Sequence, residues 1–209
     1  MRIAVVSELS AVDKNPAIVN ALAGRGHELL NVGMSSSASP ALTYLHTGFI
    51  AALLLNAGRA DLVVGGCGTG QGFFCSAAQY PAVFAGLVLD PLDAWLFRRI
   101  NAGNCISLAL NKGYGWAGEE YLRMLFDRFF EAGEGSGYPP SRAESQAASR
   151  AMLRAISGVA HRSFPDILHG LDAAVVSPAL AFPGIWEILD TPSLADGELR
   201  AALQARRKE

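Results

Sequence analysis

Residues 61–76 of the chain read Asp61-Leu62-Val63-Val64-Gly65-Gly66-Cys67-Gly68-Thr69-Gly70-Gln71-Gly72-Phe73-Phe74-Cys75-Ser76. The apolar run Leu62–Val64 predicts a buried strand, because a strand covered on both faces has continuous hydrophobicity. We expect this strand to stop at glycine, since five of the eight residues in Gly65–Gly72 are glycines that allow a sharp turn and a close approach to a ligand. The pattern over Phe73–Ala78 then suits a helix. Cys67 is therefore expected at a strand-to-helix turn.

The position of Cys67 is typical of a catalytic thiol. A thiol just before a helix N-terminus faces unpaired backbone N–H groups and the positive end of the helix dipole. Such surroundings favour a thiolate that can act as nucleophile or general base, while the glycine amides beside it can hold a developing oxyanion. However, free cysteine is also among the most buried residue types and often only fills space. From this stretch alone, Cys67 is either a catalytic residue or a packing residue.

Other kinds of glycine loop fail on spacing. A Gly-x-Gly-x-x-Gly dinucleotide fingerprint that starts at Gly68 or Gly66 needs glycine at position 73 or 71, where the chain has Phe73 or Gln71. A P-loop needs Gly-Lys-Ser/Thr, which the stretch lacks. The motif that remains is Cys-Gly-Thr-Gly-x-Gly.

Composition limits the classes of protein to which the chain can belong. The 209 residues are 51% hydrophobic and 17% charged, with a net charge of −2, so we expect one core, some apolar surface that meets a partner subunit, and no nucleic-acid partner. The three cysteines are odd in number and lack metal-ligand spacing, which favours reduced thiols, a cytoplasmic protein and no metal. Met1–Val6 is too short for a signal peptide and no apolar run has the length of a membrane span, so we expect no membrane partner.

Strands and helices alternate along the first 132 residues. Expected strands are Arg2–Val6, His27–Val32, Leu62–Val64, Val83–Leu89 and Cys105–Leu110; expected helices are Asp13–Arg25, Tyr44–Ala57, Leu92–Asn101 and Glu119–Ala132. This order predicts an α/β fold with a Rossmann-like, doubly wound, five-stranded parallel sheet. Ligands bind beyond the carboxyl ends of such strands, which here carry Ser7-Glu8, Gly66–Gly72, Asp90-Pro91 and Asn111–Gly113.

The composition changes after residue 132. Residues 133–141 are rich in glycine and proline and predict a linker between a domain at 1–132 and a mostly helical extension at 142–209. Helices are expected at Arg142–Ile156, Phe164–Leu171 and Leu194–Arg207, and Ala173–Pro183 is an apolar segment broken by two prolines. We expect this extension to pack on the core or on another subunit.

With these residues in view, residues 1–132 resemble the family of ribose-5-phosphate isomerase B and galactose-6-phosphate isomerase. The match consists of the motif Cys67–Gly72, then Ala77-Ala78 at the family's spacing, then Arg98, Asn101 and Asn104. The resemblance implies a Rossmann-like α/β/α sandwich, a homodimer or homotetramer with a site shared between subunits, and no metal or other cofactor. It implies aldose–ketose interconversion of a small sugar phosphate through an enediol.

The resemblance also implies roles for individual residues. Cys67 matches the family's thiol base, and Gly70, Gln71 and Gly72 match its oxyanion pocket. Thr69 and Tyr44 match positions that line the sugar pocket, while Asn101 matches an asparagine contributed by a neighbouring subunit. The predicted catalytic group is Cys67, Thr69, Gly70, Gln71 and Gly72, and the predicted substrate-binding group is Glu8, Tyr44, Gly68, Asn101, Arg150 and Arg154.

Several positions depart from the family's pattern. The family has Asp-His after its first strand, whereas this chain has Glu8-Leu9; Glu8 is either a ligand for a sugar hydroxyl or a helix cap. The family's ring-opening histidine is Ile100 here, and Ile cannot transfer a proton. His46 is either a satisfied core histidine or a replacement acid. Arg150 and Arg154 lie one helical turn apart and would either grip a phosphate together or form a solvated surface.

These departures predict an isomerase with an altered substrate. An open-chain or short sugar phosphate, such as a tetrose, needs no ring-opening acid, so the loss of histidine at position 100 would be tolerable. The alternative is a non-catalytic relative that binds sugar phosphate or acts as a regulator.

Overall fold

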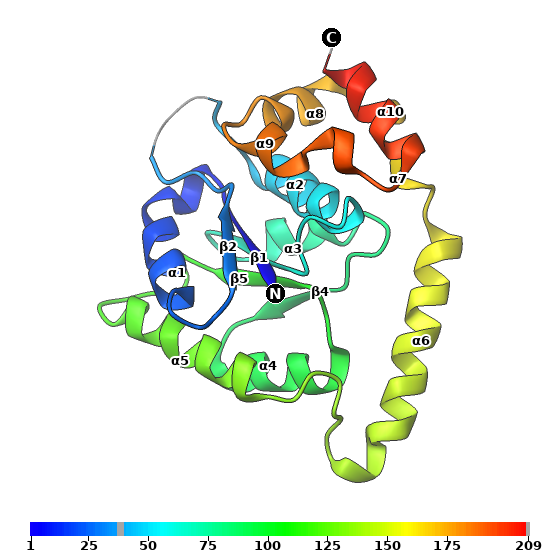
Figure 1. Ribbon diagram of the computed structural model, residues 1–209. Helices are drawn as coiled ribbons and strands as arrows, with labels where there is room; N and C mark the ends of the chain where they lie inside the picture. The colour runs from blue at the N-terminus through cyan, green and yellow to red at the C-terminus, as the bar shows by residue number, and fades with distance from the viewer. Residues whose placement is uncertain (37–39, 208–209) are drawn as a thin grey trace.

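The computed structural model of the chain describes residues 1–36 and 40–207, and within them five strands form one sheet. All pairings are parallel and the order is β2-β1-β3-β5-β4. The strands are β1 (Arg2–Ser7), β2 (Glu28–Asn31), β3 (Leu62–Cys67), β4 (Ala85–Val88) and β5 (Cys105–Ala109). Helices cover both faces of the sheet (Figure 1), which confirms the predicted five-stranded, doubly wound α/β fold.

Strand β3 is longer than the sequence predicts. Gly65 and Gly66 do not end it; they pair with β1 and β5, and the strand continues to Cys67. Glycine is tolerated inside this strand because its neighbours come too close for a side chain: a Cβ at Gly65 would clash with the Phe73 ring, and one at Gly66 with the Leu108 carbonyl oxygen. The expected stop after Val64 is therefore wrong, and Cys67 is the last residue of the strand.

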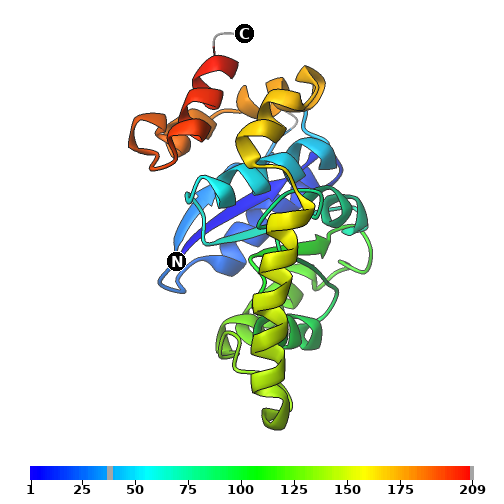
Figure 2. The ribbon, with the colours of Figure 1, turned by 90° about the vertical axis from the view of Figure 1, so that its right-hand side faces the viewer.

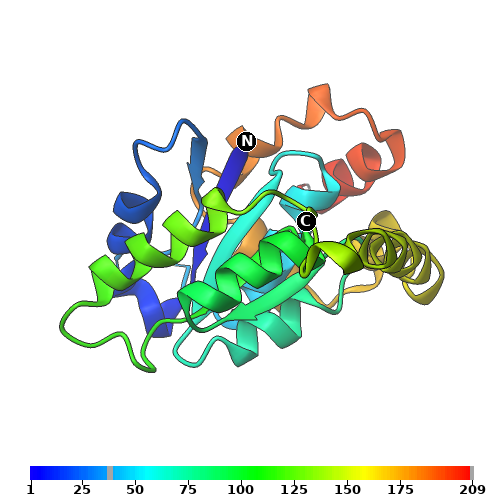
Figure 3. The ribbon, with the colours of Figure 1, turned by 90° about the horizontal axis from the view of Figure 1, so that it is seen from below.

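Two helical layers enclose the sheet. On one face lie α1 (Asn15–Leu22), α4 (Pro91–Leu96) and α5 (Gly118–Glu131). In Figure 3, α4 and α5 are seen in front of the sheet. On the other face lie α2 (Tyr44–Asn56) and α3 (Gln71–Ala77). Alternate residues of β1 point to opposite layers, with Ile3 and Val5 packed in the first core and Ala4 and Val6 in the second.

Two of the expected helices are divided. A 3-10 helix, η1 (Leu9–Lys14), precedes α1, which begins beside Pro16 and is followed by left-handed Gly24 and Gly26. The predicted helix Leu92–Asn101 is α4 followed by a π-helical turn, η2 (Phe97–Asn101), which ends at left-handed Ala102.

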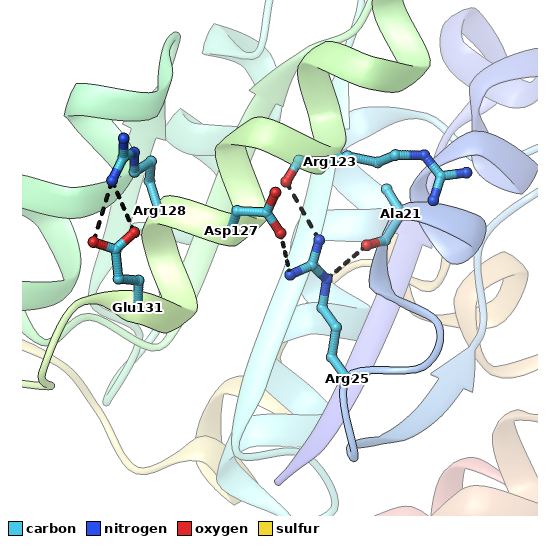
Figure 4. Close-up of polar contacts among 6 residues, drawn as sticks. All are labelled: Ala21, Arg25, Arg123, Asp127, Arg128 and Glu131. Atoms are coloured by element: carbon cyan, nitrogen blue, oxygen red, sulfur yellow. Dashed lines mark hydrogen bonds and ion pairs between the residues drawn. The ribbon is translucent and has the colours of Figure 1, made fainter.

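An arginine fastens the end of α1 to α5 (Figure 4). The Arg25 guanidinium donates to the carbonyl of Ala21 at 2.8 Å and to the carbonyl of Arg123 at 3.3 Å, and it pairs with Asp127 at 2.7 Å. Its side chain is only 20% exposed and also covers the Phe130 ring. By contrast, the Arg128–Glu131 pair on the same helix is exposed at both ends.

The C-terminal extension is helical, as predicted. After η3 (Pro140–Arg142) come α6 (Ala143–Ala160), α7 (Phe164–Gly170), α8 (Ala173–Leu180), α9 (Ile185–Leu189), η4 (Thr191–Ser193) and α10 (Gly197–Arg206). Helices α7 to α10 share the α2 side's hydrophobic core, whereas α6 has no buried residue among those described and crosses the outside of the core (Figure 2). The boundary at 133–141 stays a prediction.

Part of segment 173–183, which was expected to be broken by two prolines, forms the continuous helix α8 (Ala173–Leu180), and of the two prolines only Pro183 lies outside it. Pro178 lies inside α8 and cannot donate to the carbonyl of Ala174. The imidazole Nε2 of His46 lies 3.0 Å from that carbonyl and satisfies it. The proline is therefore tolerated because a side chain of α2 takes the place of the missing N–H.

Over the described part of the chain, no single helix is long and apolar enough to cross a bilayer. The bent pair Ala173–Leu180 and Ile185–Ser193, whose helices lie at 88° to each other, has the length and composition of a span only when the two are taken together.

Candidate active site

Cys67 lies at the carboxyl end of β3, between the ends of β1 and β5. In the sheet register, Gly66 is level with Ser7 and Cys67 is level with Ala109. The Cys67 side chain is 6% exposed, and its sulfur lies 3.9 Å from the hydroxyl of Thr69, which is exposed. The thiol is thus buried, with a polar neighbour that reaches the surface.

The turn after Cys67 is held in one conformation. Gly70 has a φ of 76°, the left-handed region that favours glycine, and it serves as the N-cap of α3. Its N–H donates to the carbonyl of Cys67 at 3.3 Å, and its carbonyl accepts from the Ser107 hydroxyl at 2.5 Å. The Gln71 N–H donates to the Thr69 hydroxyl at 3.4 Å. These hydrogen bonds hold the backbone that follows Cys67 in a tight turn.

Tyr44 covers this turn. A Cβ at Gly72 would lie 3.0 Å from Cγ of Tyr44, so the ring sits directly over the glycine backbone. Tyr44 is 44% exposed and begins α2, where Thr43 and His46 form a capping box. The structure thus places Tyr44 against Gly72 and Thr69 beside Cys67 on the same turn, and their membership of one substrate pocket stays a prediction.

His46 has both ring nitrogens engaged. Its Nδ1 accepts from the Thr43 N–H at 2.9 Å, and its Nε2 faces the Ala174 carbonyl. An acceptor at Nδ1 requires the neutral form with the proton on Nε2. This arrangement makes His46 a structural cap rather than a free acid.

Glu8 joins the site through Ser10. Glu8 is 5% exposed, and one of its carboxylate oxygens accepts from the Ser10 hydroxyl. It occupies the N-cap position of η1 but makes no capping hydrogen bond with its side chain, so the helix-cap alternative is wrong. The Ser10 hydroxyl in turn accepts from the Gly68 N–H at 3.0 Å, so the Gly68 amide is not a free donor.

Asn101 lies at the other end of the sheet. It ends η2, which leads into the amino end of β5, whereas Cys67 lies at the carboxyl end of β3. Asn101 is exposed beside the edge strand β4, in an open cleft of about 330 Å³ that Phe74, Leu87 and Asp93 also line. One copy of the chain therefore does not bring Asn101 to Cys67.

The two arginines on α6 behave differently. Arg150 donates to the carbonyl of Ile100 at 2.8 Å and to the carbonyl of Gly135 at 2.9 Å, which fixes α6 to the turn that carries Asn101. Arg154, one turn later, is exposed and has no hydrogen bond or ion pair among the described residues. Neither arginine lies among the residues that surround Cys67 in the same copy.

The other core thiol has a different setting. Complete burial raises the pKa of Cys105 to about 12, so it stays protonated. Cys75 is exposed on α3. Within residues 1–36 and 40–207, no group of three or more His, Cys, Asp or Glu side chains is placed to hold a metal ion.

Sequence reasoning missed Ser10 and gave Asn111 no role beyond a strand end. The Asn111 side chain donates to the Ser10 carbonyl at 2.6 Å, and its N–H donates to the Gly68 carbonyl at 2.9 Å. Their place just beyond β1 and β5 was the available signal, because adjacent strand ends in a parallel sheet share one edge.

Comparisons with known proteins identify similar chains. The family model for ribose/galactose isomerases matches residues 3–146. A comparison with curated protein sequences finds no match. Among solved structures, the chain is similar to a 4-deoxy-L-threo-5-hexosulose-uronate ketol-isomerase complexed with a tartrate, with 33% identity, a TM-score of 0.94 and 100% of both chains covered.

Two further solved structures are similar to this chain, one over its full length and one over part of it. A ribose-5-phosphate isomerase from Vibrio parahaemolyticus is 37% identical, with a TM-score of 0.92 and 98% of both chains covered. A ribose-5-phosphate isomerase B from Clostridium thermocellum is 20% identical, with a TM-score of 0.64, and its whole length covers 77% of this chain, which shows the fold alone. The matched family model and the two full-length likenesses together show that this chain belongs to the ribose/galactose isomerase family.

Proposed function

We propose that the protein is a ketol-isomerase that interconverts an open-chain aldose and its ketose through an enediol, with Cys67 as the base. The observation that carries this proposal is the placement of the Cys67 thiol at the carboxyl end of the central strand β3, beside a glycine turn on whose Gly72 the Tyr44 ring lies. Membership of a sugar isomerase family supports the same reaction.

The proposed reaction moves one proton between two carbons. The Cys67 thiolate takes the proton from the carbon next to the carbonyl and returns it to the former carbonyl carbon, while a proton passes from one oxygen to the other. The enediolate oxygen needs a donor that is not already used. Within α3 the Gln71 N–H donates to the Thr69 hydroxyl at 3.4 Å and the Phe74 N–H donates to the Gly70 carbonyl at 3.1 Å, so the Gly72 N–H between them is left for this task.

Position 100 favours a substrate without a closed ring. Ile100 has no group that can protonate a ring oxygen, and His46 is engaged as a cap. The compound named for the full-length neighbour, a 4-deoxy-5-hexosulose uronate, lacks a hydroxyl at C4 and has a carbonyl at C5. Neither hydroxyl that closes a furanose or pyranose ring on C1 is therefore present, so we propose this kind of open-chain keto-uronate as the substrate.

Ribose 5-phosphate is the second candidate substrate. The 37% identity with the Vibrio isomerase favours it. Against it, Arg150 has two nitrogens committed to backbone carbonyls, which leaves Arg154 as the free cation of the pair. An open-chain tetrose phosphate is the third candidate substrate. It carries a phosphate, as ribose 5-phosphate does, and it needs no ring opening, as the keto-uronate does not.

A second copy of the chain would complete the site. Asn101 and Cys67 lie at opposite ends of the sheet, so the asparagine reaches a thiol only if it comes from another copy. Surface for such contact exists in the open cleft beside β4 and on α6, where Met152, Leu153, Ile156 and Val159 are exposed. We propose a homodimer, alone or within a tetramer.

The test combines a substrate panel with a matched pair of cysteine variants. Wild type, Cys67→Ala and Cys75→Ala are assayed with the hexosulose uronate, erythrose 4-phosphate and ribose 5-phosphate. We expect fastest turnover of the uronate, a loss of about 10³-fold in kcat for Cys67→Ala, and little change for Cys75→Ala. Full activity of Cys67→Ala would exclude the thiol base, and rapid turnover of ribose 5-phosphate alone would exclude the open-chain substrate.

The same variants address the non-catalytic alternative. In the Cys75→Ala background, a base-competent Cys67 should react with iodoacetamide at a lower pH than free cysteine and be protected by the substrate. A protein that binds these compounds, turns over none of them and lacks such a reactive thiol is the non-catalytic relative.

A further inference from the structure

Three residues that follow three different strands form a closed ring of hydrogen bonds next to Cys67. The Gly68 N–H donates to the Ser10 hydroxyl at 3.0 Å, the Asn111 side chain donates to the Ser10 carbonyl at 2.6 Å, and the Asn111 N–H donates to the Gly68 carbonyl at 2.9 Å. Gly68 follows β3, Ser10 lies beyond β1, and Asn111 lies beyond β5. We call Gly68, Ser10 and Asn111 the strand-end ring.

The ring fixes the peptide unit that directly follows the thiol residue. The carbonyl of this unit belongs to Cys67 and accepts from the N–H groups of Leu110, at 3.0 Å, and Gly70, at 3.3 Å. Its N–H belongs to Gly68 and donates to Ser10. A peptide plane bonded at both ends cannot rotate without breaking a hydrogen bond, so the Cα–Cβ bond of Cys67 is held in one direction too.

Glu8 sets the orientation of the Ser10 hydroxyl. A serine hydroxyl can donate one hydrogen bond, and here the nearly buried Glu8 carboxylate accepts it. A lone pair of the same oxygen is thereby left facing the Gly68 N–H. The Ser10 hydroxyl and the Asn111 side-chain nitrogen both lie against Gly68, since a Cβ there would be in van der Waals contact with each at 3.4 Å.

We propose that Ser10 and Asn111 are positioning residues for the isomerase reaction, which hold the peptide after Cys67 so that the thiol meets the substrate's carbon-bound proton. This inference rests on the proposed function of Cys67 as the base. Misplacing a reacting group by about 1 Å can cost about 100-fold in rate, so loosening this peptide should reduce kcat more than it changes KM.

The experiment uses three variants and one matched control in the full chain. Ser10→Ala removes the acceptor for Gly68, Ser10→Thr keeps a hydroxyl, and Asn111→Ala removes the donor to Ser10. Ser163→Ala is the control, because the Ser163 hydroxyl accepts from the Asp166 N–H at 3.2 Å in the C-terminal extension, away from the thiol. Measurements are kcat and KM on the substrate found by the panel, and hydrogen–deuterium exchange of the peptide that contains Gly68.

We expect kcat to fall by about 10-fold to 100-fold in Ser10→Ala and Asn111→Ala with KM within about twofold, and to recover in Ser10→Thr. Exchange at Gly68 should become faster in Ser10→Ala but not in Ser163→Ala. Unchanged kcat with faster exchange would overturn the positioning role, as would a raised KM at unchanged kcat, which would make Ser10 a substrate contact. Unchanged exchange would overturn the ring itself, and this readout needs no substrate.

The two proposals fail in different ways. If Cys67→Ala keeps full activity, the thiol base is excluded and the inference falls with it. If Cys67→Ala is inactive while Ser10→Ala and Asn111→Ala match wild type, only the role of the strand-end ring is excluded.

Discussion

His27 couples the stability of the fold to pH. Its Nδ1 is buried without a hydrogen-bond partner among the described residues, and its ring packs 4.6 Å from the ring of Phe130. Desolvation lowers the pKa of His27 from its ordinary value of 6.5, and the charges of the N-terminal amino group, Arg25 and Arg98 lower it further. The folded state therefore disfavours the protonated form.

The direction of the pH effect follows from this shift. Because the folded pKa lies below the unfolded one, the neutral ring's contribution is fully present above about pH 6.5 and is lost as the pH falls through the unfolded and then the folded pKa. We expect urea unfolding to show a smaller decrease in stability between pH 7.5 and pH 5 for His27→Phe than for wild type. The exposed His169, changed to Phe, is the control; equal pH dependence in all three proteins would contradict the effect.

At the scale of residues, the sequence located Cys67 and its turn but not their supports. The motif Cys67–Gly72 is local, so its spacing could be read directly. Ser10 and Asn111 are 58 and 101 residues away from their partners Gly68 and Ser10. Which residues meet at a strand end depends on strand order, and the role of Arg150 as a support for the Ile100 carbonyl depends on where α6 begins.

Among the elements, α1 and α5 are connected through the side chain of Arg25, so substitution of this residue tests the connection. Arg25 combines two hydrogen bonds to carbonyls with a partly buried ion pair and the Phe130 ring, whereas Arg128 makes only an exposed pair with Glu131. We expect Arg25→Ala to lower the free energy of unfolding by about 1–2 kcal/mol, because carbonyls are left without a donor and apolar surface is uncovered.

The matched change is Arg128→Ala, on α5 near the helix residues that Arg25 contacts (Figure 4). Exposed ion pairs contribute about 0–1 kcal/mol, so we expect a change near zero. Chemical denaturation of both variants gives the comparison. Equal losses of stability would show that the link between α1 and α5 does not depend on the Arg25 contacts.

Element predictions succeeded where hydrophobic pattern dominated and failed where tertiary contacts compensated. Five strands and the main helices follow from apolar runs, which are local. The continuation of β3 through Gly65 and Gly66 depends on Phe73 and Leu108, and the survival of helix α8 with Pro178 inside depends on His46. Neither compensation can be read from the segment itself.

For the whole molecule, the order of the strands decides what one copy can do alone. The order β2-β1-β3-β5-β4 leaves β4 at an edge and places η2, with Asn101, at the amino end of β5. Helix α6 runs along the outside of the core (Figure 2). Arg150, in the middle of α6, donates to the carbonyl of Ile100, the residue before Asn101. The alternation of strands and helices predicted a parallel sheet but not this order, so the separation of Asn101 from Cys67 required the structure.

This separation allows a direct test of a shared site. If each site takes Cys67 from one copy and Asn101 from another, Cys67→Ala and Asn101→Ala proteins should each be strongly impaired alone. When the two are co-expressed in equal amounts, half of the dimers are mixed, and each mixed dimer contains one site with both native residues. A symmetric dimer therefore predicts recovery of about a quarter of the wild-type activity. A chain whose site needs only its own residues would show no recovery on mixing, and differently tagged copies purified in tandem would establish that mixed dimers are present.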